Sequence, residues 1–134
     1  MSNMRRIKPL IILVVVLFVV SSCDDEIFGP RSFQGVWKAT EYDSDYSSMT
    51  FEVGIDYFPG DSSRVLIGNF SNLGLDYDVT ADLSGLDLTI PFQSVDGRGG
   101  RFRISGSGRA SSNIRRIDLN YEVDGDEFTA VFTK

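Results

Sequence analysis

Apolar and polar residues alternate along most of the chain from residue 33 to its end. The clearest run is 49–57, in which odd-numbered residues are apolar and even-numbered residues are polar or glycine; 76–83 and 116–123 repeat this pattern. A period of two predicts β-strands with one face on the core and one in water. Less regular runs predict further strands at residues 35–42, 65–70, 86–92, 101–108 and 127–133.

The connections between these strands are short, which predicts that consecutive strands are antiparallel neighbours in a meander. Ser84-Gly85 and Asp124-Gly125 are turn sequences, and the second favours a type I′ hairpin because both positions tolerate positive φ. An all-β meander of about eight strands can close into a barrel or fold into a two-sheet sandwich. We favour the barrel, because glycines inside the strands mark bends or bulges where a small sheet turns sharply: Gly54, Gly68, Gly106 and Gly108.

The first residues follow a different pattern. Arg5, Arg6 and Lys8 precede an uninterrupted apolar run at 10–20, and small residues follow it. This order is typical of a helical secretory signal peptide, here residues 1–22. The apolar run is shorter than the roughly 20 residues that a membrane-spanning helix needs.

The single cysteine, Cys23, stands directly after this segment. A disulfide within the chain or a multi-cysteine metal site needs partners that the chain lacks, and no histidine is present to activate a thiol. The sequence Val20-Ser21-Ser22-Cys23 resembles the bacterial lipobox. That resemblance implies cleavage before Cys23, a diacylglycerol on its thiol and an acylated amino terminus, palmitate being one expected chain. A lipid with several chains anchors a protein stably, since each buried methylene contributes about 0.8 kcal/mol.

The acidic residues after the cysteine suggest a sorting signal. In proteobacterial lipoproteins an aspartate after the cysteine is associated with inner-membrane retention, whereas an acidic patch there resembles a surface-export signal of the Bacteroidota. The resemblance of the β-domain to lipoproteins of the Bacteroidota, described below, favours the second interpretation. We accordingly expect Asp24, Asp25 and Glu26 to direct the protein to the outer membrane, with the domain on the cell surface. Residues 23–32 are predicted to be a tether, and residues 33–134 to be the β-domain.

Net charge restricts the partners. The signal segment holds three basic residues and no acidic ones, so the mature chain has 13 − 3 = 10 Lys and Arg against 19 Asp and Glu, a net charge of −9. Nucleic-acid binding proteins have the opposite balance, and anionic headgroups repel such a domain. We expect membrane contact through the lipid alone, no nucleic acid and a monomeric protein.

A second resemblance begins at Gly35-Val36-Trp37, which looks like the opening G-x-W motif of lipocalins and other calycins. The wider pattern is similar to small lipocalin-like lipoproteins of the Bacteroidota, through 65–70, 88–93, 104–109 and 117–134. The resemblance implies a barrel in which Trp37 plugs one end or contacts a small apolar ligand. The late-strand arginine that packs on this tryptophan in lipocalins has no match in the sequence.

Arginines gather in one segment of this acidic chain, at Arg98, Arg101 and Arg103. They could form an anion-binding patch, although cross-strand pairing with nearby acids is the favoured interpretation. Two acidic groups, 124–127 and Asp76 with Asp78 and Asp82, lack the spacing of a calcium loop. We interpret the first as a hairpin turn and the second as a solvated strand face, and we expect no metal and no cofactor.

The absence of histidine and of a free thiol removes Ser-His-Asp and Cys-His sites. The sequence therefore favours a lipid-anchored binding or accessory protein of the bacterial cell envelope without catalytic activity. Its expected partner is a small apolar ligand or an outer-membrane protein. Two alternatives remain: a lipocalin-like carrier of a small apolar ligand, and a glycosidase using two carboxylates in a cleft.

Overall fold

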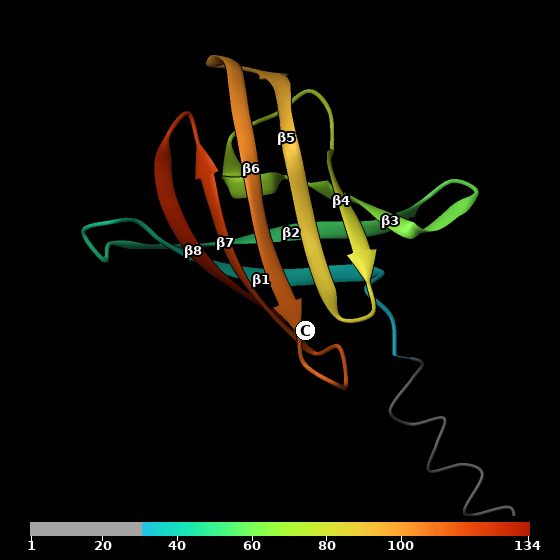
Figure 1. Ribbon diagram of the computed structural model, residues 1–134. Helices are drawn as coiled ribbons and strands as arrows, with labels where there is room; N and C mark the ends of the chain where they lie inside the picture. Colours follow the sequence, from blue (N-terminus) through green and yellow to red (C-terminus); the bar gives the residue numbers. More distant parts are fainter. Residues whose placement is uncertain (1–30) are drawn as a thin grey trace, which may run out of the picture. The chain divides into compact units, whose positions relative to one another are not determined.

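The computed structural model describes residues 31–134, so the predicted signal peptide, Cys23 and the acidic residues 24–26 lie outside it. The described chain is all-β, and Figure 1 shows its eight strands in sequence order. A short 3₁₀ helix, η1 (Phe70–Asn72), lies between the third and fourth strands. The strands are β1 (Gly35–Tyr42), β2 (Ser48–Phe58), β3 (Asp61–Gly68), β4 (Val79–Ser84), β5 (Asp87–Gly97), β6 (Gly100–Ala110), β7 (Arg116–Val123) and β8 (Asp126–Thr133).

The strands form a closed barrel. Each strand pairs antiparallel with the next, and β8 also pairs with β1, from Thr129 opposite Tyr42 to Thr133 opposite Lys38 (Figure 1). Closure gives both β1 and β8 a hydrogen-bonded neighbour on each side and so removes the sheet edges. The predicted meander and barrel are confirmed, and the two-sheet sandwich is wrong.

The barrel interior is filled with apolar side chains from every strand. The strict alternation in β7 places Ile117, Leu119 and Tyr121 inside and the polar residues between them outside. Inward-facing residues of all eight strands pack in one continuous cluster. Its largest fully buried side chains include Trp37, Phe70, Phe132 and several isoleucines. Because an eight-stranded barrel is only just wide enough for side chains, its own residues form the core.

The connection between β3 and β4 differs from the prediction. The expected strand 65–70 ends at Gly68, and Asn69 and Ser71 adopt positive φ, which turns Phe70 into the barrel. The expected strand 76–83 begins only at Val79, and Tyr77 is 70% exposed rather than facing the core. Residues 76–78 alternate like a strand, yet they belong to a loop whose Asp76 N–H donates to the Asp96 carbonyl at the end of β5.

The glycines inside the strands coincide with a bulge at one position only. Register runs without a shift through Gly54 and Gly108, and Gly68 ends β3. The two irregularities lie at Tyr57/Phe58 and between Ile90 and Gln93, and the second begins opposite Gly106, the partner of Ile90. At the second irregularity Phe92 turns outward and is 72% exposed. A bulge needs no glycine, because the extra residue is accommodated by a local change of twist.

The barrel has two ends, named here for what they carry. The terminal end holds Phe33 and the carboxyl-terminal residue Lys134, while the loop end holds the connections 43–47, 69–78, 98–99 and 124–125. Within residues 31–134 we find no helix with the length and apolar character needed to cross a membrane.

Candidate binding groove

Trp37 closes the interior at the terminal end. Its side chain is fully buried, and its indole Nε1–H donates to the Phe33 carbonyl at 2.8 Å. The Lys134 ammonium lies 4.6 Å from the centroid of the Trp37 ring, and it donates to the carbonyls of Ser32 and Gln34 at 2.6 and 2.8 Å. Partial burial and the nearby Arg115 lower the pKa of Lys134. The terminal lysine thus packs on the tryptophan ring as a cation, a contact that the sequence pattern did not predict.

A buried carboxylate lies inside the barrel near the loop end. Glu41 is only 6% exposed and accepts hydrogen bonds from the Ser71 and Tyr121 hydroxyls. Tyr121 also contacts Phe70 and Phe128, with ring centroids 4.6 and 5.9 Å away. Burial raises the pKa of Tyr121, and the hydrogen bond to Glu41 raises it further. The sequence contains a signal for this buried acid, because Glu41 follows Trp37 and Ala39 at every second position and so lies with them on the inward face of β1.

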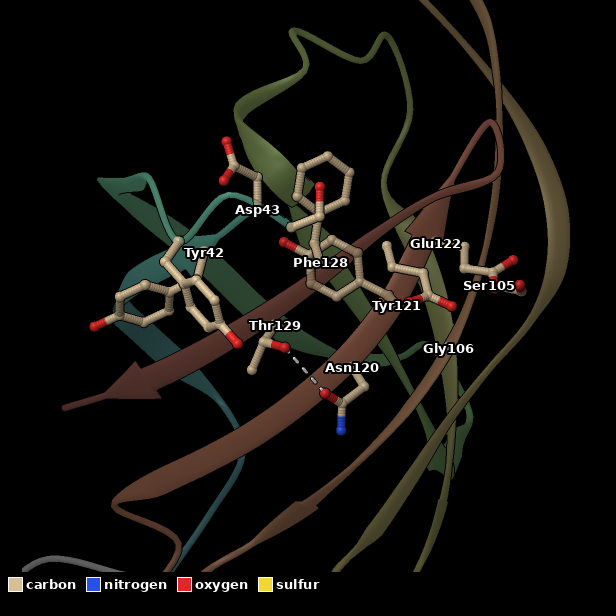
Figure 2. Close-up of a pocket in the computed structure, with 12 residues that line it drawn as sticks. Tyr42, Asp43, Ser105, Gly106, Asn120, Tyr121, Glu122, Phe128 and Thr129 are labelled. Carbon is tan, nitrogen blue, oxygen red and sulfur yellow. Dashed lines mark hydrogen bonds between the residues drawn. The ribbon is translucent and has the colours of Figure 1, made fainter.

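A groove of about 490 Å³ lies outside the barrel near its loop end. Figure 2 shows the side chains that line it. Ser105, Asn120, Glu122, Glu127 and Thr129 contribute from the outer faces of β6, β7 and β8, and the end of β1 and the β1–β2 connection contribute the rest of the outer lining. Gly106, Tyr121 and Phe128 also line the groove, from the inward faces of the same strands. The groove is an open surface that borders the core at Tyr121 and Phe128, while the rest of the interior is filled with side chains.

The groove floor consists of two rows of outward-facing residues. Ser105, Glu122 and Glu127 are successive partners across β6, β7 and β8 and form the first row. Asn120, Thr129 and Tyr42 form the second row across β7, β8 and β1. The Thr129 hydroxyl donates to Asn120 Oδ1 at 3.2 Å, as the dashed line in Figure 2 shows. The second row exists only because the barrel closes between β8 and β1.

The β1–β2 connection forms the wall beside these rows. Asp43 organises this loop, because its Oδ1 accepts the backbone N–H groups of Asp45 and Ser47 at 2.9 Å each. Tyr46 has a φ of 62° and is 87% exposed. A tyrosine with positive φ is uncommon, and here its N–H is fixed by the Asp43 carbonyl at 3.0 Å. Both Tyr42 and Tyr46 therefore present aromatic surface to solvent at the groove.

Charges on the outer face of the barrel are mostly paired with opposite charges. Directly opposed residues of unlike charge occur at Lys38–Glu52, Arg64–Asp82, Asp87–Arg109, Asp96–Arg101 and Arg109–Asp118. Glu122 and Glu127 are the exception, because they oppose each other directly on β7 and β8. Neither carboxylate has an ion pair or side-chain hydrogen bond within residues 31–134, and like charges at this spacing are destabilising.

The three arginines singled out in the sequence do not gather in this groove. Arg101 and Arg103 share the outer face of β6, where Arg101 pairs with Asp96 at 3.0 Å and Arg103 approaches Asp124 at 3.8 Å. Arg98 lies in the β5–β6 turn and has no ion pair within the described chain. Arg103 lines a neighbouring hollow of about 280 Å³ that also includes Glu122.

The acidic turn 124–127 is a hairpin, with Asp124 and Gly125 at φ values of 52° and 86°, as the sequence predicts. Asp76 and Asp78 lie in the β3–β4 loop, whereas Asp82 pairs with Arg64 on the strands. Across residues 31–134, no three cysteine or acidic side chains are grouped so that they could hold a metal ion.

Comparison with known proteins identifies the architecture. No family model and no curated protein matches the chain. A solved structure described as a redesigned beta barrel matches with a TM-score of 0.56 and 12% sequence identity, covering 76% of this chain and 90% of that one. At this identity the similarity concerns the fold alone, and it agrees with the closed barrel described above.

Proposed function

We propose that this chain is a lipid-anchored module of the bacterial cell envelope that binds a ligand on the outside of its barrel and has no catalytic activity. The observation that carries the binding role is the open groove between β6 and the β1–β2 connection. The anchor rests on the sequence, in which an apolar signal segment ends directly before the lipobox-like residues and Cys23. Anchoring through lipid suits a domain whose net negative charge is repelled by anionic headgroups.

Binding on the outside fits the barrel better than carriage of an apolar ligand within it. A carrier holds its ligand in the interior, where Trp37, Phe70 and Phe132 belong to one packed cluster. Interiors packed in this way leave few voids larger than a water molecule. The groove, in contrast, has the volume of a small-molecule site, for which about 300–1,000 Å³ is usual.

The same groove contains the carboxylate pair that glycoside hydrolysis would require. Glu122 and Glu127 oppose each other across β7 and β8, but both are exposed on the outer face of the sheet. A carboxyl group that acts as general acid needs an environment that disfavours its ionised form, such as an apolar pocket. Two carboxyl groups on an open outer face lack such an environment, so the pair suits ligand recognition by charge rather than acid catalysis.

Replacement of Cys23 by alanine tests the anchor. The natural chain should incorporate radiolabelled palmitate in growing cells, and Cys23→Ala should not, because no thiol remains to carry the lipid. Ser22→Ala is the matched control: it changes the adjacent small residue for another small residue and should still incorporate the label. Labelling of Cys23→Ala to the level of the natural chain would overturn the anchored module.

A further inference from the structure

The groove combines aromatic surface with negative charge, and the nearest arginine, Arg103, lies in the neighbouring hollow, where it approaches Asp124. The lining of the groove includes the carboxylates of Asp43, Glu122 and Glu127, and it includes no lysine or arginine. We infer that the groove binds a small organic cation, whose ammonium group lies between Glu122 and Glu127 and whose carbon skeleton lies against Tyr42 and Tyr46. This inference rests on the proposed function, because it takes the groove as the binding surface.

The opposed glutamates are the first reason for a cationic ligand. Elsewhere on the outer face, directly opposed charges are of opposite sign, so the barrel balances its charge strand by strand. At Glu122 and Glu127 the Cβ atoms of directly opposed residues are about 5 Å apart, which places two negative charges together at a cost. An ammonium group between them removes the repulsion and adds two attractions. The free protein thus stores unfavourable electrostatic energy that a cation releases.

The tyrosines are the second reason, and they favour an organic cation over a metal ion. The face of a tyrosine ring attracts a cation and also packs against methylene groups. The backbone of Tyr46 is held at the groove by its loop, so little backbone freedom remains to be lost on binding. A metal ion would instead require several oxygen ligands around one point, and aromatic faces supply none.

Neutral polar groups complete the site. An ammonium group has three N–H donors, and the two glutamates supply acceptors for two of them. Ser105 is the direct partner of Glu122 in the same row, so its hydroxyl oxygen can accept the third. Asn120 and Thr129 are already joined by a hydrogen bond in the second row, which holds both side chains in place below the ligand.

Amide NMR of the full chain in a neutral polyoxyethylene detergent tests the inference, with 1,5-diaminopentane as the probe and 1,5-pentanediol as its uncharged counterpart. The diamine should shift the amides of residues 120–129 saturably, and the diol should not. Added salt should weaken the response, because the contact is electrostatic and exposed. Glu122→Gln should raise the dissociation constant of the diamine about tenfold, equivalent to about 1.4 kcal/mol.

Glu52→Gln is the matched control for charge. Glu52 is exposed on the outer face of β2 opposite Lys38, and its replacement changes the net charge by the same amount as Glu122→Gln. It should leave the dissociation constant unchanged. Glu122→Gln should also raise the thermal midpoint of the free protein, because it removes the repulsion from Glu127.

Three results would overturn the inference. Equal shifts from the diol and the diamine would mean that charge is not recognised, and equal weakening by Glu52→Gln would mean that only overall charge matters. Shifts at residues 120–129 from maltotriose but not from the diamine would identify a glycan groove. Binding of maltotriose would disprove the cation site but not the proposed binding module. Failure of the Cys23 test would disprove the lipid anchor but not the cation site, so the two proposals can fail separately.

Discussion

Glu41 is an acidic residue buried in the apolar interior of the barrel. A carboxylate inside an apolar barrel is costly unless hydrogen bonds replace its hydration. Here the Ser71 and Tyr121 hydroxyls supply two donors, one from η1 at the loop end and one from β7, which only β8 separates from β1. Hydrogen bonds to a charged acceptor are stronger than neutral ones, so this small network fixes η1 against the strands. Removal of either hydroxyl would leave the buried carboxyl group of Glu41 with one of these two hydrogen bonds.

Tyr121→Phe should therefore reduce stability, and it should do so in a pH-dependent way. At pH 8 the lost hydrogen bond to Glu41 should cost about 1–3 kcal/mol of unfolding free energy. The raised pKa of Tyr121 means that the folded protein keeps its phenol protonated while the unfolded chain ionises near pH 10. The stability of the natural chain should thus be intact below pH 10 and fall as the pH rises above it. Urea unfolding between pH 8 and 11.5 measures both effects.

The contribution of Tyr121 is isolated by comparison of two variants. Tyr121→Phe should lose the part of the alkaline decline that this phenol causes, so its curve should be flatter than that of the natural chain. Tyr46→Phe changes an exposed tyrosine in the same way and should follow the natural chain at every pH. Parallel curves for Tyr121→Phe and the natural chain would contradict the assignment.

At the scale of elements, the alternation of apolar residues was sufficient wherever a strand pairs regularly along its length. The predicted ranges 35–42 and 116–123 coincide with β1 and β7. The expected strand 86–92 ends five residues before the end of β5, because the irregularity between Ile90 and Gln93 shifts the inward-facing residues from even to odd positions. Residues 76–78 alternate correctly but have no continuous strand partner. Pairing is a property of the fold, so local pattern could not decide these cases.

The groove, too, could be predicted only in part from the local sequence pattern. Alternation in β7 predicts that Asn120 and Glu122 face outward, and the Asp124-Gly125 turn predicts that Glu122 lies near Glu127. Nothing local indicates that Tyr42 lies beside Thr129, because that contact joins the first strand to the last. The carboxylate pair was within reach of sequence reasoning, whereas the aromatic wall required the closed barrel.

Substitution of Gly106 and of Gly54 by alanine measures how much glycine contributes to stability at two strand positions. A Cβ atom added at Gly106 would lie 2.5 Å from Tyr121 Cβ and 2.6 Å from the Asn120 carbonyl oxygen, so Gly106→Ala must displace backbone. We expect a loss of about 1–3 kcal/mol, which lowers the melting temperature by about 4–8 °C per kcal/mol. At Gly54 an added Cβ would have no neighbour within 4 Å.

Gly54→Ala is therefore the control, with an expected gain of up to about 1 kcal/mol from reduced freedom of the unfolded chain. Thermal unfolding followed by circular dichroism compares the two variants. Equal destabilisation of both would mean that glycine flexibility, rather than the close approach of β6 and β7 at Tyr121, explains the residue at position 106.

At the scale of the whole molecule, a closed barrel with balanced surface pairs is a compact module that needs no partner to cover a sheet edge. That architecture affects how its cellular location can be tested. Protease treatment of intact cells cleaves a folded barrel only after local opening, so resistance would not separate a surface location from a periplasmic one. A chemical label that reaches exposed side chains on the folded protein avoids this ambiguity.

Lys38 is suited to such a label, because it lies on the outer face of β1 and is exposed to solvent although it is opposite Glu52. If Asp24, Asp25 and Glu26 direct surface export, an amine reagent that does not cross membranes should modify Lys38 on intact cells. Replacement of these three acids by Asn, Asn and Gln should abolish labelling until the cells are lysed, while the protein still incorporates palmitate. Lys38→Arg identifies the labelled site by mass spectrometry. Equal labelling of the natural and neutralised chains on intact cells would show that the acids carry no sorting information.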